Sequence, residues 1–277
     1  MPTSAGTEVY NTDVVPVVAR GTTMSDAELD IALATDVAVI LRDDAGLDDI
    51  ATTLAGIADT GFSNDALRRV LDVAPDPTGW RVGEALAEAF LVEHRRCEFP
   101  WPMGRDLRNP NASPAGTDLV GFQATGTGNT DHRFAFCEVK TSYDSAVPPS
   151  VVTGRHGLIA QVEELRDSTV VKDNLLRYLA IHARRQDWEP HFQGAARRYI
   201  NAPAEVSLFG ILVRDTPPDA RDLSTRAGNL AAGCPQQTSI ELRAIYLPRD
   251  TIDPTQTLPP PTAKPSLAAR AVAALSP

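Results

Sequence analysis

Residues 116–142 read GTDLVGFQATGTGNTDHRFAFCEVKTS, and this stretch decides the fold. Two runs rich in aromatic and β-branched residues, 118–122 and 133–141, lie on either side of a glycine-containing loop at 124–129. Strand-forming residues around a short glycine-rich loop are typical of a β-hairpin. We therefore expect these two runs to form antiparallel strands of a central sheet.

The second of these strands ends with the residues Glu-Val-Lys at 138–140. Alternate residues of a strand project from the same face, so Glu138 and Lys140 share a face with Phe136. The phenylalanine extends that face into the core, and the charged pair is expected where the face leaves the core. Cys137 projects from the opposite face and is predicted to be buried.

Further elements are predicted along the rest of the chain. The sequence favours an amphipathic helix at 81–94, helical structure over 156–187 and a short helix at 189–199. The near-continuous apolar run VSLFGILV at 206–213 is typical of a strand covered on both faces, and the alternating run at 240–247 predicts an edge strand. This pattern predicts an α/β protein with a mixed central sheet flanked by helices.

The first 77 residues read as a separate, mainly helical region. Residues 8–20 favour one strand or two short extended pieces, and a capping box formed by Ser25 and Glu28 predicts a helix that starts near Asp26. The apolar run 37–41 fits either the end of that helix or a strand. Two more short helices are expected at 48–58 and 64–71.

Prolines set the predicted domain boundaries. The sequence PDPTG at 75–79 interrupts the helical pattern, so we expect an N-terminal region at 1–77 and a main domain at 78–247. The remaining residues, 248–277, contain seven prolines and predict an extended tail.

Charge is distributed unevenly between these parts. The formal net charge of the chain is −10, and residues 1–78 carry 14 acidic and 4 basic side chains, which accounts for all of it. This charge is typical of a solvated acidic surface, and it also fits a segment that contacts a protein partner. No apolar run is long enough to span a membrane, and no secretory signal is recognisable, so a cytoplasmic location is expected.

Four charged residues in three elements point to chemistry. The hairpin places Asp118 near Glu138 and Lys140, and the preceding helix can bring Glu84 alongside them. Three carboxylates in one place favour a hard cation such as Mg²⁺, with Mn²⁺ as the alternative, and a neighbouring lysine can position water at a phosphate. Glu88, one helical turn after Glu84, competes for the same role.

These residues resemble the PD-(D/E)xK nucleases, the restriction-endonuclease-like family. Glu84, Asp118 in GTDLVGF, and the Glu138/Lys140 pair in CEVKTS match the order of that family's site, although Thr117 stands where the family has proline. Gln161 in QVEEL is similar to the glutamine signature of the exonuclease-like branch. The resemblance implies a restriction-endonuclease-like core, Mg²⁺-dependent DNA cleavage, and Asp118, Glu138 and Glu84 as metal ligands.

A narrower resemblance concerns the runs GEALAEAFL, GTDLVGF, CEVKTSY and SLFGILVRDT, which are similar to the HamA nuclease subunits of Hachiman anti-phage defence. That family implies a HamB-type helicase partner that restrains the nuclease and delivers it to DNA. Two other functions remain open from the residues alone: a catalytically inactive, nuclease-like binding subunit, and a repair or recombination nuclease.

The other polar groups give weaker patterns. The arginine pairs at 184–185 and 197–198 fit either DNA contacts or solvated helix charges. The three cysteines have no CxxC spacing, which argues against a cysteine-based zinc site. The five histidines lack HxxxH spacing and are expected to be structural or surface residues. They are His94, His132, His156, His182 and His191.

Overall fold

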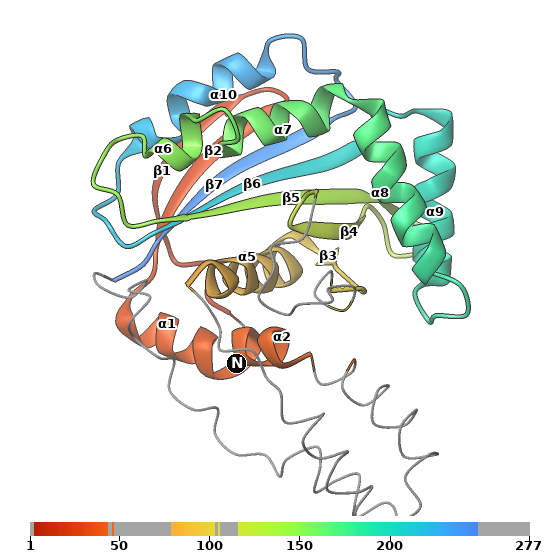
Figure 1. Cartoon of the computed structure of the whole chain (residues 1–277), viewed down its shortest axis with the longest axis horizontal. Helices are drawn as coiled ribbons and strands as arrows, with labels where there is room; N and C mark the ends of the chain where they lie inside the picture. The colour runs from red at the N-terminus through yellow and green to blue at the C-terminus, as the bar shows by residue number, and fades with distance from the viewer. Residues whose placement is uncertain (1–2, 44–45, 47–78, 103–104, 106–115, 249–277) are drawn as a thin grey trace, which may run out of the picture.

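The computed structural model describes residues 3–43, 46, 79–102, 105 and 116–248. A seven-stranded mixed sheet forms its centre, with helices packed against both faces (Figure 1). The strand order across the sheet is β1-β2-β7-β6-β5-β4-β3. The strands are β1 (Thr7–Val14), β2 (Val17–Thr23), β3 (Cys97–Glu98), β4 (Leu119–Ala124), β5 (His132–Ser142), β6 (Val206–Arg214) and β7 (Ser239–Tyr246).

The middle of the sheet is parallel and its two sides are antiparallel. Strands β2, β7, β6 and β5 run parallel to one another. At one side β1 pairs antiparallel with β2, and at the other β5, β4 and β3 continue as antiparallel neighbours. The parallel strands therefore end at a common edge, where loops that follow them can form a site.

Helices cover the two faces unequally. One face carries α5 (Gly79–Arg95), with α1 (Asp26–Ala32), η1 (Leu33–Val37) and α2 (Ala38–Arg42) packed below it in Figure 1. The other face carries α6 (Ser150–Thr153), α7 (Leu158–Asp167), α8 (Thr169–His182), α9 (Glu189–Asn201) and α10 (Ser224–Ala231), preceded by the 3₁₀ turn η3 (Ala220–Asp222). Each face of the sheet packs into its own hydrophobic core.

The hairpin and the central strand agree with the sequence-based predictions. β4 and β5 pair antiparallel around the loop, and every residue of β6 is buried, as a strand covered on both faces requires. The helix predicted at 81–94 corresponds to α5, and that at 189–199 to α9. The helical stretch 156–187 is divided, because Ser168 ends α7 and caps α8 with its side chain.

The edge position predicted for residues 240–247 is wrong. β7 lies inside the sheet, between β6 and β2, and pairs in parallel with β2 over seven residues from Val17 to Thr23. Its alternating pattern resembled an edge strand because several positions are polar. Two of these polar residues, Glu241 and Arg243, are paired with each other at 2.8 Å and so can occupy an interior strand.

The predicted division at residues 77/78 does not divide the sheet. The N-terminal residues from Thr7 to Thr23 form β1 and β2, so the sheet includes strands from both sides of that boundary. The described part of the N-terminal region is therefore two strands followed by the α1–α2 helices, and residues 37–41 are helical. Ser25 and Glu28 form the expected capping box at the start of α1.

Several expectations concern residues outside the described ones: the helices at 48–58 and 64–71, and the proline-rich tail from residue 249. Within the described part of the chain, no helix is both long and apolar enough to cross a membrane.

Candidate metal-dependent active site

The candidate site lies where β4 begins beside β5. Leu119 pairs with Cys137, and β5 continues to Ser142 paired only with β6 on its other side. The side chains just before β4 replace the missing ladder bonds: the Asp118 carboxylate accepts a hydrogen bond from the Val139 amide at 2.7 Å. The register of the hairpin, which pairs Leu119 with Cys137, thus fixes the position of the Asp118 carboxylate.

Thr117 anchors the same turn from the other side. Its buried hydroxyl donates a hydrogen bond to the Cys137 carbonyl at 2.8 Å. Thr117 stands where the resembled family has proline, and a proline would lack this hydroxyl donor. The sequence alone gave no sign of this positioning role.

Glu138 and Lys140 are in direct contact. The Lys140 ammonium donates to Glu138 Oε1 at 2.5 Å, and the Glu138 residue is only 1% exposed, while the lysine side chain remains 24% exposed. Burial, the charge of Asp118 and a hydrogen bond to its carboxyl raise the pKa of Glu138 to about 7, against the opposing effect of Lys140. Burial also raises the pKa of Asp118, although its bond from the Val139 amide opposes this.

Helix α5 supplies the third carboxylate through a close helix–strand contact. A Cβ on Gly83 would lie 2.1 Å from Thr141 Oγ1, so only glycine lets α5 approach β5 this closely. The next residue, Glu84, lies near enough to Asp118 and Glu138 for their charges to act on its carboxyl. Burial, then the negative charge of Asp118, with a smaller effect of Glu138, raise its pKa to about 8.

The rival carboxylate Glu88 has different neighbours. Burial, then the charge of Asp43, raise its pKa to about 8, and none of the hairpin carboxylates contributes. Asp43 itself forms a salt bridge with Arg105 at 2.5 Å. Of the two α5 carboxylates, Glu84 is therefore the one on which the charges of Asp118 and Glu138 act.

Gln161 lies on α7, which packs over β5 and β6 on the face that Glu138 occupies. The neighbouring Val162 and Leu158 lie over Gly210, the residue that pairs with Glu138 across to β6. The Gln161 Oε1 atom is buried and has no hydrogen-bond partner among the described residues. A buried amide oxygen without a partner is costly, so this atom is suited to a water or a ligand group.

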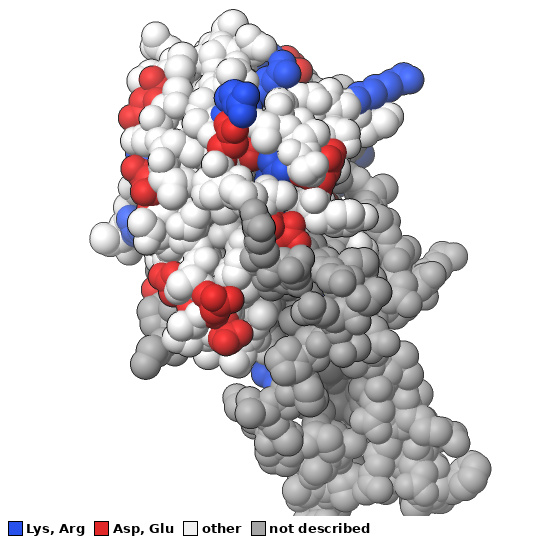
Figure 2. Space-filling model, turned by 90° about the vertical axis from the view of Figure 1, so that its left-hand side faces the viewer, with Lys and Arg blue, Asp and Glu red and all other residues white. Residues whose placement is uncertain are grey.

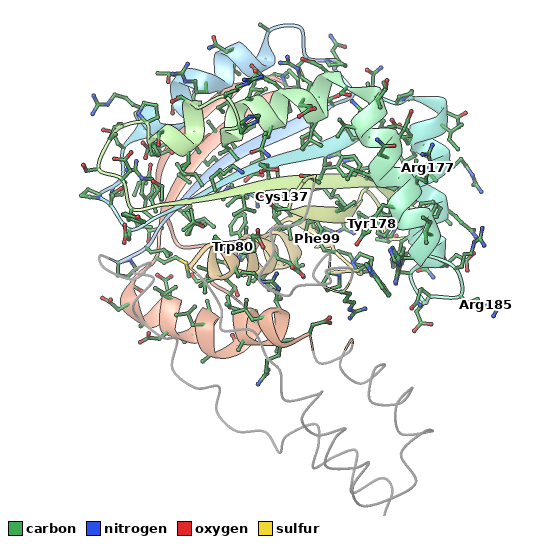
Figure 3. The ribbon with its side chains drawn as sticks, viewed as in Figure 1. Trp80, Phe99, Cys137, Arg177, Tyr178 and Arg185 are labelled. Carbon is green, nitrogen blue, oxygen red and sulfur yellow. The ribbon has the colours of Figure 1, made fainter. Side chains whose placement is uncertain are left out.

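Cys137 is a core residue, as expected. It packs with Ala135 and Val139 against α5, and Figure 3 shows it on the α5 side of β5. Burial raises the pKa of its thiol well above the ordinary value. A thiol in this state is unreactive, and Cys137 therefore contributes packing and no chemistry.

The donor set suits a hard divalent cation by its chemistry, but the three carboxylates do not all lie within 4.8 Å of one another, so a shared ion would require their side chains to move closer. Asp118, Glu138 and Glu84 offer only oxygen ligands, and each has a raised pKa mainly because burial disfavours the charged carboxylate; repulsion from the charge of Asp118 adds to this at Glu138 and Glu84. A bound cation would offset that repulsion, which protons otherwise relieve. Mg²⁺ is commonly held by one or two carboxylates together with waters and substrate phosphate.

The described surface carries charges of both signs. Figure 2 shows one face on which acidic side chains gather at the height of α1, while acidic and basic side chains are mixed in its upper half. The exposed acidic residues Asp26 and Asp30 belong to α1. Arg185 points outward from the turn after α8 (Figure 3), whereas Arg198 is engaged by Glu205 at 2.6 Å.

No protein-family model and no curated protein matches this sequence. The residues and their geometry therefore have to carry any assignment of function.

Proposed function

We propose that this chain is a divalent-cation-dependent deoxyribonuclease that hydrolyses phosphodiester bonds. The observation that carries the proposal is the contact between the buried Glu138 carboxylate and Lys140, with Asp118 held beside them by the Val139 amide. Pairs of acids with a lysine at such a point of a hairpin are the recurring arrangement of the PD-(D/E)xK family that the sequence resembles.

Asp118, Glu138 and Glu84 would hold the cation, expected to be Mg²⁺ or Mn²⁺. When bound, such an ion polarises a phosphoryl oxygen and lowers the pKa of a coordinated water. The carboxylates themselves would orient that water and share its proton. Because Lys140 is partly exposed beside Glu138, its ammonium can reach an incoming phosphate and offset charge that develops there.

Gln161 is assigned a positioning role in this proposal. Its buried oxygen has no hydrogen-bond partner in the described part of the chain and lies on the helix that covers the Glu138 face. A hydrogen bond to water or to the substrate backbone would satisfy it.

The chain's charge supports a partner that supplies the grip on DNA. Affinity for duplex DNA comes mainly from basic side chains that displace its counterions. This chain has a net charge of −10, and the acidic residues concentrate in its first 78 positions. We therefore propose a helicase subunit as partner and anti-phage defence as the setting, as the Hachiman resemblance implies.

The catalytic proposal is tested with plasmid and linear DNA, with and without Mg²⁺ and EDTA. Glu138→Ala and Lys140→Ala should each reduce cleavage by at least about a hundredfold, since members of such a unit act together. Glu93→Ala is the matched control, because Glu93 is an exposed carboxylate on α5, nine residues after Glu84. Full cleavage by both variants, or by the wild-type chain in excess EDTA, would contradict the assignment.

The partner proposal needs a test that leaves the sheet intact. Removing residues 1–78 would strip β2 from β7, so truncation cannot separate docking from folding. Neutralising the exposed Asp26 and Asp30 of α1 to asparagine should instead weaken co-purification with the helicase, while Asp187→Asn should not. Equal recovery of the helicase with the wild type, with the Asp26/Asp30 variant and with Asp187→Asn would exclude α1 from the interface.

A further inference from the structure

A second group of possible ligands lies at the other end of β5. Glu98 on β3, His132 at the start of β5 and His191 on α9 each offer one ligand atom, and these atoms all lie within 4.8 Å of one another. Among the described residues, no other group of three or more histidine, cysteine or acidic side chains has that spacing. From the sequence these histidines read as ordinary structural or surface residues.

The fold brings the three residues together by successive contacts. Glu98 pairs with Phe122 on β4, and Ala124 of β4 pairs with His132. Helix α9 is pressed against the hairpin loop, because a Cβ on Gly194 would lie 2.2 Å from the Thr130 carbonyl oxygen. This close approach places His191, about one turn earlier on α9, against the start of β5.

The side chains already contact one another. His191 Nδ1 and Glu98 Oε2 are 2.6 Å apart, and the two imidazoles are stacked with ring centroids 4.1 Å apart. The buried Nδ1 of His132 makes no hydrogen bond of standard geometry within the described residues, although the Asn129 backbone lies near enough to favour the charged ring slightly. Burial and the proximity of His191 lower the pKa of His132.

We propose that Glu98, His132 and His191 form a binding site for a borderline-soft divalent transition metal, with Zn²⁺ as the expected ion. Two imidazoles and one carboxylate suit Zn²⁺, which commonly takes three protein ligands and a water. The all-oxygen cluster around Asp118 suits Mg²⁺ instead. The chemistry of the donors thus separates the two sites.

Only small movements are needed to close the site. Ligands about 2.0–2.1 Å from a tetrahedral ion lie about 3.4 Å apart, so no pair needs to approach by more than roughly 1.4 Å. The Glu98 and His191 side chains are 40% and 25% exposed, so neither is fully enclosed by packed neighbours. His132 is six residues before Glu138 along β5, about 20 Å at the rise of a strand, so the two ions would be independent.

The bound ion would clamp the edge of the sheet. β3 has only two residues and lies at the end of the strand order, where a short strand gains little from its ladder. The ion would join β3 to β5 and α9 directly. At a hundredfold excess of free Zn²⁺ over its dissociation constant, we expect the melting temperature to rise by roughly 5–10 °C.

The experiment measures Zn²⁺ binding to the full chain by equilibrium dialysis with excess Mg²⁺, in a Glu138→Ala background that weakens the nuclease site. We expect one Zn²⁺ per chain and, with Co²⁺ as probe, the intense visible absorption of a four-coordinate ion. His191→Ala and His132→Ala should each weaken binding at least tenfold and remove the thermal shift. His156→Ala, an exposed histidine outside the cluster, should change neither.

The readout distinguishes this site from the proposed nuclease, because it needs no DNA cleavage. Binding that is unchanged in both His191→Ala and His132→Ala would overturn the proposal. Absence of Zn²⁺ binding by the background chain would also overturn it and leave an ordinary Glu98–His191 ion pair with a stacked histidine. Since His191→Ala can loosen α9, His191→Gln provides a second variant of closer volume, and its metal-free melting curve checks folding.

Discussion

The two carboxylates of α5 give the sharpest test of the proposed active site, because they share a pKa of about 8 for different reasons. Glu84 owes its shift to burial and to the hairpin carboxylates, whereas Glu88 owes its shift to burial and Asp43. Glutamine keeps the volume of glutamate and removes the charge. The paired variants Glu84→Gln and Glu88→Gln therefore separate a cation ligand from an ordinary buried carboxyl.

The sign of the metal-free effect follows from the two pKa values. The pKa of each carboxyl rises from 4.5 to about 8 on folding, so between these values the folded chain keeps a proton that the unfolded chain has released. The free energy of unfolding is therefore highest below about pH 4.5 and falls until about pH 8. Each glutamine variant lacks this titrating carboxyl, so its free energy of unfolding should increase relative to that of the wild type as the pH rises.

The size of the gain is bounded by the shift. A rise from 4.5 to about 8 corresponds to at most about 5 kcal/mol, at 1.36 kcal/mol for each pKa unit. Both side chains retain some exposure, and solvent relaxation reduces the expected gain to about 1–3 kcal/mol near pH 9. Near pH 4 the two variants should differ from the wild type by much less.

Added Mg²⁺ should then distinguish the variants. At a hundredfold excess over its dissociation constant, Mg²⁺ stabilises a chain that binds it by about 2.7 kcal/mol. The wild type and Glu88→Gln should show this gain, and Glu84→Gln should lose about 1.4 kcal/mol of it for each tenfold loss of affinity. Urea denaturation followed by circular dichroism near pH 9, with Mg²⁺ or EDTA, measures the free energy of unfolding of the wild type and of both variants in each condition.

Full Mg²⁺ stabilisation of Glu84→Gln, or its loss in Glu88→Gln, would exclude Glu84 as the cation ligand of α5. A similar loss of Mg²⁺ stabilisation in both variants would mean that the cation depends on the total negative charge of α5 and not on one carboxylate. Cleavage rates on plasmid DNA should follow the same order, with Glu84→Gln the slower enzyme.

Two further predictions concern the packing that supports the site. Gly83→Ala should lower the free energy of unfolding by about 1–3 kcal/mol, although alanine is the better helix former. Thr141→Ala in the same chain should restore most of this stability, because the contact that remains, to the Cβ of residue 141, is at 3.4 Å. Urea denaturation of the single and double variants measures both changes. Asp222→Ala should cost about 3–5 kcal/mol in the same assay, since it strands the fully buried Arg214, which it meets at 2.6 Å; a loss below 1 kcal/mol would contradict that account.

The elements that the sequence predicted well are those whose signals are local. The hairpin of β4 and β5 depends on two short runs and one loop, and its register follows once the loop is placed. The all-buried strand β6 is recognisable from its continuous apolar run. Both features concern neighbouring residues, and tertiary packing had little opportunity to override them.

The errors arise where distant segments pair. β7 reads as an edge strand because nothing in its own residues reveals that β2, more than two hundred residues earlier, adds to it in parallel. The boundary expected at residues 77/78 failed to separate the sheet for the same reason. Proline and glycine clusters mark where a chain turns, and they do not mark which strands will later meet.

The two clusters on β5 illustrate the same limit in the chemistry of the protein. Asp118, Glu138 and Lys140 belong to one hairpin, so the spacing of the residues already brings them together, and the Gly83 contact adds Glu84. Glu98 and His191 are 93 residues apart and meet only after β3, the hairpin and α9 have packed. Searching for histidines at helical spacing cannot detect such a group, because each ligand comes from a different element. The hairpin cluster can therefore be recognised from a sequence motif, whereas the imidazole cluster can be recognised only in the folded structure. That cluster also depends on the close approach of α9 to the hairpin loop that Gly194 allows.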